Sequence, residues 1–213
     1  WIMDNKKWEI TKFEALVRLK DWDKIYTPWY FLDKIKWTNL MKELTKAMIS
    51  KTIEAMKWNN YSFSLNLTEH DINDNEIHNL IKIELEGNKI DSSRLLIEIL
   101  EETSWTSEKF IKSINNLKKI WLKIAIDDFG TWFSWFSRVE KVEPDILKID
   151  RSLIEWLTDN SRWYEVVKWI VSFAHKIWSE VVAEFVENQE IQDLLVKIWV
   201  DYSQWYLYSK PSE

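Results

Sequence analysis

Cysteine is absent from this chain, which excludes disulfide bonds and thiolate metal sites and favours a reducing compartment such as the cytoplasm. Long apolar runs and leader-like segments are also absent, so a membrane anchor of a parent protein would lie outside this segment. Acidic residues outnumber basic residues, and the net charge of −6 disfavours a nucleic-acid polymer as partner. The same charge makes bridging cations necessary for a phosphate-bearing substrate. The 213 residues suit one domain, residues 1–213, which we expect to be excised from a longer protein.

Glycine is scarce and tryptophan abundant. The chain has 2 Gly and 16 Trp, whereas average usage of about 7% would give roughly 15 glycines. Trp121, Trp178 and Trp199 each stand between an expected helix and the next strand, where glycine commonly ends a helix. We hypothesise that the source organism reads UGA as glycine and that the printed sequence renders this codon as Trp. The alternative is a Trp-rich core, whose residues would follow strand or helix periodicity.

Strand-like and helix-like segments alternate along the chain. After a first strand and a turn around Pro28, the pattern predicts an amphipathic helix over 39–57. The expected strands are 9–19, 61–67, 95–100, 122–129, 145–150, 180–186 and 201–207, and the later helices are 74–86, 106–120, 161–177 and 188–198. Repeated strand–helix units with apolar strands predict an α/β fold with a largely parallel sheet, closed into a barrel.

Polar side chains stand where six of these strands end, at Asn66, Glu98, the pair Asp127 and Asp128, Lys148, Glu184 and Gln204. A parallel barrel gathers its strand ends at one mouth, so these groups are expected to form one charged site. Each also has an ordinary explanation, such as a surface ion pair, a helix cap or a lysine reaching solvent. Asp127 and Asp128 can share a site only if the strand bends there, and Gly130 makes a bend plausible.

Seven ordered blocks carry a family resemblance. Glu14, Ala15, Leu16 and Arg18 resemble the signature EALxR, and SLNLT, IEILEE, DDFGT, LKIDRSLI, AEFVEN and QWYLYSKP follow in order over residues 64–211. The chain resembles the EAL domain family of cyclic-di-GMP phosphodiesterases. The resemblance implies a modified TIM (β/α)8-type barrel with one antiparallel strand. It also implies hydrolysis of cyclic di-GMP to linear 5′-pGpG with two Mg²⁺ or Mn²⁺ ions.

The resemblance assigns roles residue by residue. The first ion is expected on Glu14, Asn66, Glu98 and Asp127, and the second on Asp127, Asp128 and Glu184. Lys148 would orient the attacking water. The resemblance implies that the catalytic residues are Glu14, Asp128, Lys148 and Glu184. Arg18, Gln204 and Asp150 are expected at the substrate. Glu101 would anchor the loop after DDFG, while Glu187 and Asp150 would hold Lys148 and the metal carboxylates in place.

The resemblance leaves two functions open. An active phosphodiesterase is favoured because every ligand type is present, and the alternative is an inactive receptor module that binds cyclic di-GMP. Phe185 departs from a family glycine beside Glu184 and therefore bears on substrate fit. Further expectations from the resemblance are a homodimer through barrel helices near DDFG and an upstream sensory or GGDEF domain.

Overall fold

The computed structural model describes residues 1–99, 107–130, 135–158 and 161–204. Eight strands form a closed barrel in the order β1-β10-β9-β8-β7-β6-β5-β2, and β3 and β4 form a separate hairpin. The strands are β1 Ile2–Asp4, β2 Glu9–Ala15, β3 Leu19–Asp21, β4 Lys24–Tyr26, β5 Ser62–Leu67, β6 Leu95–Ile99, β7 Lys123–Phe129, β8 Ile146–Ile149, β9 Glu180–Ala183 and β10 Tyr202–Gln204. The expected barrel is therefore confirmed.

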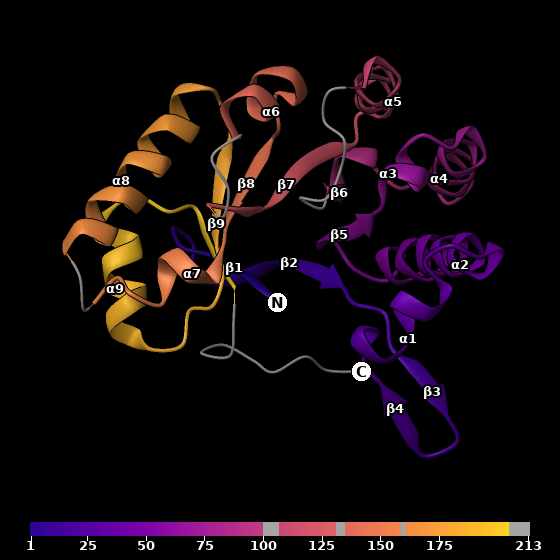
Figure 1. Cartoon of the computed structure of the whole chain (residues 1–213), viewed down its shortest axis with the longest axis horizontal. Coiled ribbons are helices and arrows are strands. Elements are labelled where there is room, and N and C mark those ends of the chain that lie inside the picture. Colours follow the sequence, from indigo (N-terminus) through magenta and orange to yellow (C-terminus); the bar gives the residue numbers. More distant parts are fainter. Residues whose placement is uncertain (100–106, 131–134, 159–160, 205–213) are drawn as a thin grey trace.

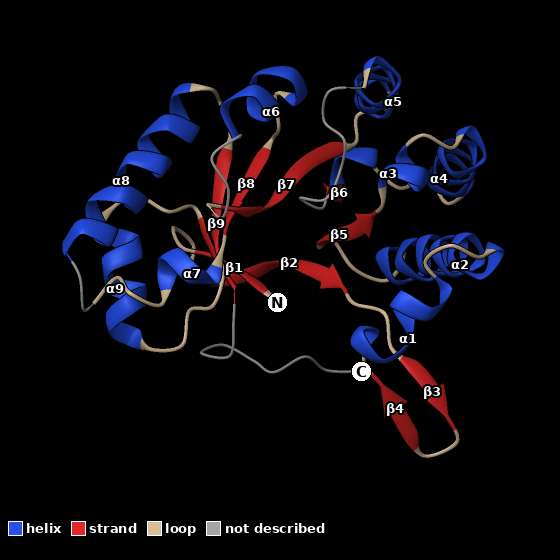
Figure 2. Cartoon of the chain, in the orientation of Figure 1, coloured by secondary structure: helices blue, strands red, loops and turns tan. Residues whose placement is uncertain are grey.

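Helices surround the barrel, as Figures 1 and 2 show. They are α1 Pro28–Ile35, α2 Asn39–Met56, α3 Glu69–Ile72, α4 Asn75–Gly87, α5 Glu108–Lys119, α6 Trp135–Val142, α7 Arg151–Ile154, α8 Ser161–Lys176 and α9 Gln189–Lys197, with a short 3₁₀ turn at Ser92–Arg94. The main apolar core lies between these helices and the outer faces of the strands. In the described parts of the chain, no helix has the length and apolarity needed to span a bilayer.

The antiparallel member of the barrel is β1, which pairs antiparallel with both β2 and β10. The neighbouring pairs, β2 with β5 and β9 with β10, are parallel. The sequence analysis predicted no strand before residue 9. Three residues are too few to show a two-residue alternation, so this strand leaves no periodic signal.

Two predictions near the N-terminus were wrong. The predicted strand over 9–19 ends at Ala15, because Leu19 already belongs to the hairpin formed by β3 and β4. The predicted turn around Pro28 is the start of helix α1, with Pro28 in the first turn. Proline suits this position because its missing N–H would have no partner within the helix and its φ is already helical.

The barrel interior is layered by the two-residue period of its strands. Ile2, Leu96, Ala125, Ile146 and Val182 form a small inner apolar cluster, with Tyr202 packed against it. Two residues beyond Leu96 on β6 stands Glu98, and two beyond Ile146 on β8 stands Lys148, so both point to the same interior at the next level. The apolar layer thus supports a charged layer at the carboxyl ends of the parallel strands.

Asp201 ties β10 to its neighbours just before the strand begins. Its Oδ2 accepts hydrogen bonds from the Val181 N–H at 3.0 Å and from His175 Nε2 at 2.7 Å, and its Oδ1 lies 3.1 Å from Lys6 Nζ. Burial opposes ionisation, but these donors outweigh it and hold the pKa of Asp201 below its usual value. Its contribution to stability is therefore present above about pH 4 and lost as the pH falls further.

We expect Asp201→Ala to lower the free energy of unfolding by about 2 kcal/mol at pH 7, because it leaves a buried N–H without its partner. Urea denaturation followed by circular dichroism measures the change. Asp193→Ala, at an exposed site on α9, serves as the control and is expected to change stability little. Equal midpoints for the two variants would contradict this role of Asp201.

Candidate metal centre and active site

A single buried lysine organises the barrel mouth. Lys148 Nζ lies 2.7 Å from Glu184 Oε1, 2.9 Å from Asp127 Oδ1, 3.0 Å from Glu98 Oε2 and 3.9 Å from Glu14 Oε2. Its side chain is only 2% exposed, so it does not reach solvent as an ordinary surface lysine would. The four carboxylates come from β2, β6, β7 and the residue after β9. The structure therefore brings together groups that are up to 170 positions apart in the chain (184 − 14).

Two amides extend this cluster around Glu14. Asn66 Nδ2 donates to Glu14 Oε1 at 2.9 Å, and Gln204 Nε2 donates to Glu14 Oε2 at 2.6 Å. Both oxygens of Glu14 thus face the mouth, and its side chain is 11% exposed. Glu14 therefore does not form a surface ion pair with Arg18, whose Nη1 donates to the Val17 carbonyl instead.

Strand β7 bends where the two aspartates stand. Its register with β8 is irregular between Ile126 and Phe129, and Asp128 has a left-handed backbone with φ 51°. This local bend lets adjacent side chains share one side of the strand, which regular alternation forbids. The bend expected at the two aspartates is confirmed at Asp128, and Gly130 just beyond the strand also has a positive φ, of 128°.

The mouth carries more negative than positive charge, and the titration of its groups reflects this. Burial raises the pKa of Glu98 to about 8 and that of Glu184 to about 7, since nearby carboxylates add to the rise and Lys148 only partly opposes it. For Glu14, burial is outweighed by Lys148 and by the two amide donors, so its pKa is lowered. Burial alone would lower the pKa of Lys148, but the surrounding carboxylates hold it well above its ordinary value.

The oxygen atoms of the mouth suit divalent cations. Asp127, Asp128 and Glu184 each offer one carboxylate oxygen, and the three oxygens lie within 4.8 Å of one another. Glu98 Oε1 is buried without a hydrogen-bond partner. Hard oxygen donors and excess negative charge are what Mg²⁺ and Mn²⁺ prefer, so the residues present fit the expected ions.

Several expected residues lie apart from this cluster. Arg18 is exposed, and its Nη1 donates to the carbonyl of Val17 at 2.8 Å. Asp150 caps α7, accepting from the Ser152 N–H at 2.9 Å, and Glu187 is exposed. Among the described residues, neither Asp150 nor Glu187 forms an ion pair with Lys148. Their expected role in holding the metal carboxylates stays a prediction. Glu101 lies outside the described residues.

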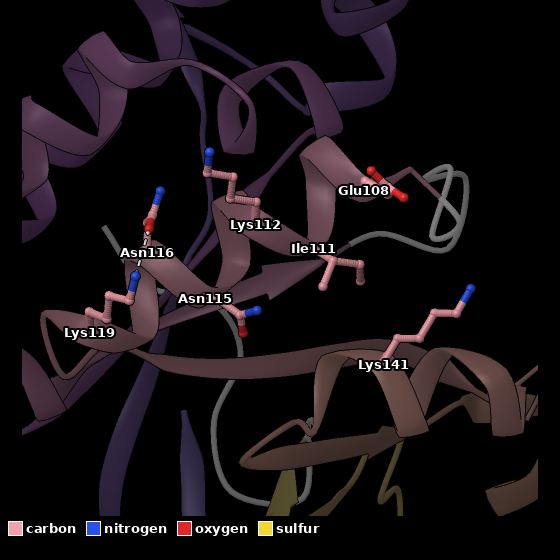
Figure 3. Close-up of a pocket in the computed structure, with 7 residues that line it drawn as sticks. All are labelled: Glu108, Ile111, Lys112, Asn115, Asn116, Lys119 and Lys141. Atoms are coloured by element: carbon pink, nitrogen blue, oxygen red, sulfur yellow. Dashed lines mark hydrogen bonds between the residues drawn. The ribbon is translucent and has the colours of Figure 1, made fainter.

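A hollow of about 480 Å³ lies on the outside of the barrel between α5 and α6, away from the mouth. Figure 3 shows its lining, which consists of Glu108, Ile111, Lys112, Asn115, Asn116 and Lys119 from α5 and Lys141 from α6. Among the described residues that line it, Glu108 is the only one with a carboxylate. This hollow therefore does not offer the ligands of a divalent metal site.

Comparisons with known proteins agree with the fold. The family described as "EAL domain" matches residues 2–211. Cyclic di-GMP phosphodiesterase PdeF of Escherichia coli is 31% identical over 205 residues, covering 93% of this chain and 27% of that protein. An EAL domain protein from Listeria monocytogenes superimposes with a TM-score of 0.85 at 29% identity, covering 99% of this chain and 85% of that one. The EAL enzyme Bd1971 in its cAMP and cyclic-di-GMP bound form gives a TM-score of 0.92 at 24% identity, covering 100% of this chain and 60% of that one.

The buried lysine offers a direct test of this arrangement. We expect Lys148→Met to lower the free energy of unfolding by about 3 kcal/mol without added metal, because it leaves buried carboxylates uncompensated. Chemical denaturation in EDTA measures the loss. Lys168→Met removes an exposed lysine 3.8 Å from Glu165 on α8 and is expected to cost less than about 1 kcal/mol. If Lys148→Met is as stable as the control, Lys148 does not compensate the mouth.

Proposed function

The chain belongs to the EAL domain family, and from this premise we propose that it hydrolyses cyclic di-GMP to linear 5′-pGpG. The observation that carries the proposal is the mouth itself, where carboxylates from several strands surround one buried lysine. The comparisons support the substrate, since PdeF is named a cyclic di-GMP phosphodiesterase. Every expected ligand type within the described residues is present at the mouth.

The residues divide into two overlapping ligand sets. We assign Glu14, Asn66, Glu98 and Asp127 to one cation, and Asp127, Asp128 and Glu184 to the other. The support is that Glu14 and Asn66 are hydrogen-bonded, that Glu98 has an unsatisfied oxygen, and that the last three carboxylates converge. When bound, two divalent cations lower the pKa of a water and offset charge on the phosphate oxygens.

Lys148 and Gln204 complete the proposed chemistry. Lys148 is fixed among the carboxylates, so its ammonium can orient a water for attack on phosphorus and offset negative charge as it develops. The attacking oxygen forms a new P–O bond, the bond to the sugar 3′-oxygen breaks, and that oxygen takes up a proton. Gln204, held by Glu14, is proposed at the substrate together with Arg18 and Asp150. Arg18 would have to leave the Val17 carbonyl to bind a phosphate.

The chain spans about a quarter of the length of curated relatives such as PdeF. We therefore propose that residues 1–213 form an EAL domain excised from a longer signalling protein, with an upstream sensory or GGDEF domain. We also propose cytoplasmic placement of this domain and a homodimer formed through the barrel helices.

Loss of a shared metal ligand tests the proposed reaction. We expect Asp127→Asn to lower turnover of cyclic di-GMP at least about 100-fold, because this residue is assigned to both cations. Product pGpG is separated by chromatography after incubation with Mg²⁺ or Mn²⁺. Asp193→Asn on α9 is the control and is expected to keep wild-type turnover. Wild-type turnover that persists in excess EDTA would contradict the metal-dependent reaction.

The receptor alternative has its own support and its own outcome. Phe185, in place of a family glycine, is buried at the mouth directly beside Glu184. A protein that binds cyclic di-GMP with either ion but releases no pGpG would be a receptor, and the proposed hydrolysis would be wrong.

A further inference from the structure

Tryptophan occupies backbone positions that suit glycine. Among the described residues, nine residues other than glycine have a left-handed φ, and five of them are Trp. These are Trp8, Trp22, Trp121, Trp178 and Trp199, with φ between 51° and 67°. Trp makes up 16 of 213 residues, so fewer than one of nine would be expected by chance. In this region the Cβ of any L-residue crowds the backbone, and glycine alone avoids that cost.

Three of the five share one helix-ending motif. Trp121, Trp178 and Trp199 follow α5, α8 and α9, and each N–H donates to the carbonyl three residues earlier at 2.9–3.2 Å. The next N–H in each case donates to the carbonyl five residues earlier, as Ser179 does to Ala174 at 3.0 Å. This pair of bonds defines the Schellman motif, whose left-handed residue is usually glycine. Each of these helices is followed along the chain by the next barrel strand, α5 by β7, α8 by β9 and α9 by β10.

These five Trp side chains are not stabilised by burial. The five side chains are between 55% and 93% exposed. Among the Trp side chains whose burial the structure describes, none is fully buried, and Trp163 packs against the core as a partly buried residue. The Trp-rich core considered from the sequence is therefore wrong. A large aromatic that is both conformationally costly and exposed lacks the usual compensation of burial.

We propose that the native polypeptide carries glycine at these positions because its source reads UGA as glycine. Peptides from the source cells test this directly. Trypsin cuts after Lys119, Lys176 and Lys197, so three peptides begin with Ile120, Ile177 and Ile198, each followed by one of the Trp positions. Tandem mass spectrometry is expected to read Ile-Gly at the start of each. Ile-Trp in any of them would overturn the proposal.

The backbone argument has a separate test in recombinant protein. Trp121→Gly, Trp178→Gly and Trp199→Gly are each expected to raise the Tm by about 2–4 °C, because left-handed backbone strain is relieved. Trp169→Gly, at an exposed right-handed position inside α8, is the matched control and is expected to lower the Tm. A lower Tm for all four variants would show that the left-handed positions do not favour glycine.

One left-handed residue at the mouth is not Trp, and it has a partner. Phe185 has φ 60° and is 7% exposed, and the guanidinium of Arg151 lies 3.6 Å from the centre of its ring. Arg151 Nε also lies 3.0 Å from Glu155 Oε2. Stacking and pairing together fix the plane of the guanidinium. A residue with a strained backbone, such as Phe185, often lies at a functional site. The sequence analysis did not single out its partner Arg151.

Its place in the fold puts Arg151 at the rim of the mouth. It starts α7, three residues after Lys148, and it covers the residue next to Glu184. Neither Nη group has a hydrogen-bond partner among the described residues. The side chain is 59% exposed, so these donors are accessible to a ligand above the mouth.

Resting on the proposed function, we infer that Arg151 binds the phosphate of the cyclic dinucleotide that is not cleaved. The substrate has two phosphodiesters, and the proposed cations of the mouth would contact the one that is hydrolysed. A planar guanidinium with two unused Nη groups matches the paired oxygens of the other. Phe185 is then a positioning residue, which holds the guanidinium plane toward the ligand.

We expect Arg151→Ala to raise the KM for cyclic di-GMP about 10-fold or more while kcat changes less than about 3-fold, because a charge-assisted contact made throughout the reaction is lost. Phe185→Leu keeps apolar volume and is expected to raise KM by a smaller factor. Arg151→Lys should recover part of the loss, which a purely structural role would not produce. Lys168→Ala on α8 is the control with unchanged KM.

Two outcomes separate this inference from the proposed function. An unchanged KM in Arg151→Ala, with active wild type, would overturn the inference alone. If the wild type binds without turnover, the dissociation constant of cyclic di-GMP replaces KM as the measure, and an equal constant in the variant has the same meaning. Wild type that neither binds nor hydrolyses cyclic di-GMP would overturn the proposed function and the inference together.

Discussion

The ammonium of Lys148 is the interaction on which the mouth depends. Four carboxylates approach it, and removing it would leave them to repel one another in a region largely closed to water. Burial raises the pKa of Glu98 and of Glu184, neighbouring carboxylates add to the rise, and the single positive charge of Lys148 opposes it only in part. The remaining imbalance is what makes the same group of side chains suitable for divalent cations. The stability of the folded chain and the proposed binding of metal therefore draw on one set of charges.

The barrel supplies this cluster by geometry rather than by neighbouring sequence. An inner apolar layer, which includes Leu96 and Ile146, lies directly below Glu98 and Lys148 on the same strands. The two-residue period then places each charged side chain inside the barrel, while the residues between them, such as Ile97 and Leu147, pack against the helices. A register slip of one residue would exchange the two sets and bury charge against the helices. The site and the core are thus specified by the same alternation.

The sequence predicted most of this arrangement, and its failures have physical causes. Long periodic segments such as 39–57 and 161–177 lie within two residues of α2 and α8. Strand β1 was missed because three residues carry no period, and α1 was missed because Pro28 is compatible with both a turn and a first helical turn. The cluster around Lys148 was predicted from strand ends, whereas the bend at Asp128 and the stacking of Arg151 on Phe185 depend on backbone geometry and packing that composition does not encode. The positions of Asp150 and Glu187 likewise depend on tertiary structure, and the sequence did not predict them.

The central proposal is that the carboxylates of the mouth would hold two divalent cations, with Asp127 assigned to both ligand sets. Crystals of the domain grown with Mn²⁺ and measured at the manganese absorption edge test it most directly. The account predicts two anomalous peaks at the mouth, both in contact with Asp127. One is expected on the side of Glu98 and the other on the side of Glu184. Anomalous density absent from the mouth in crystals that hold Mn²⁺ elsewhere would contradict it.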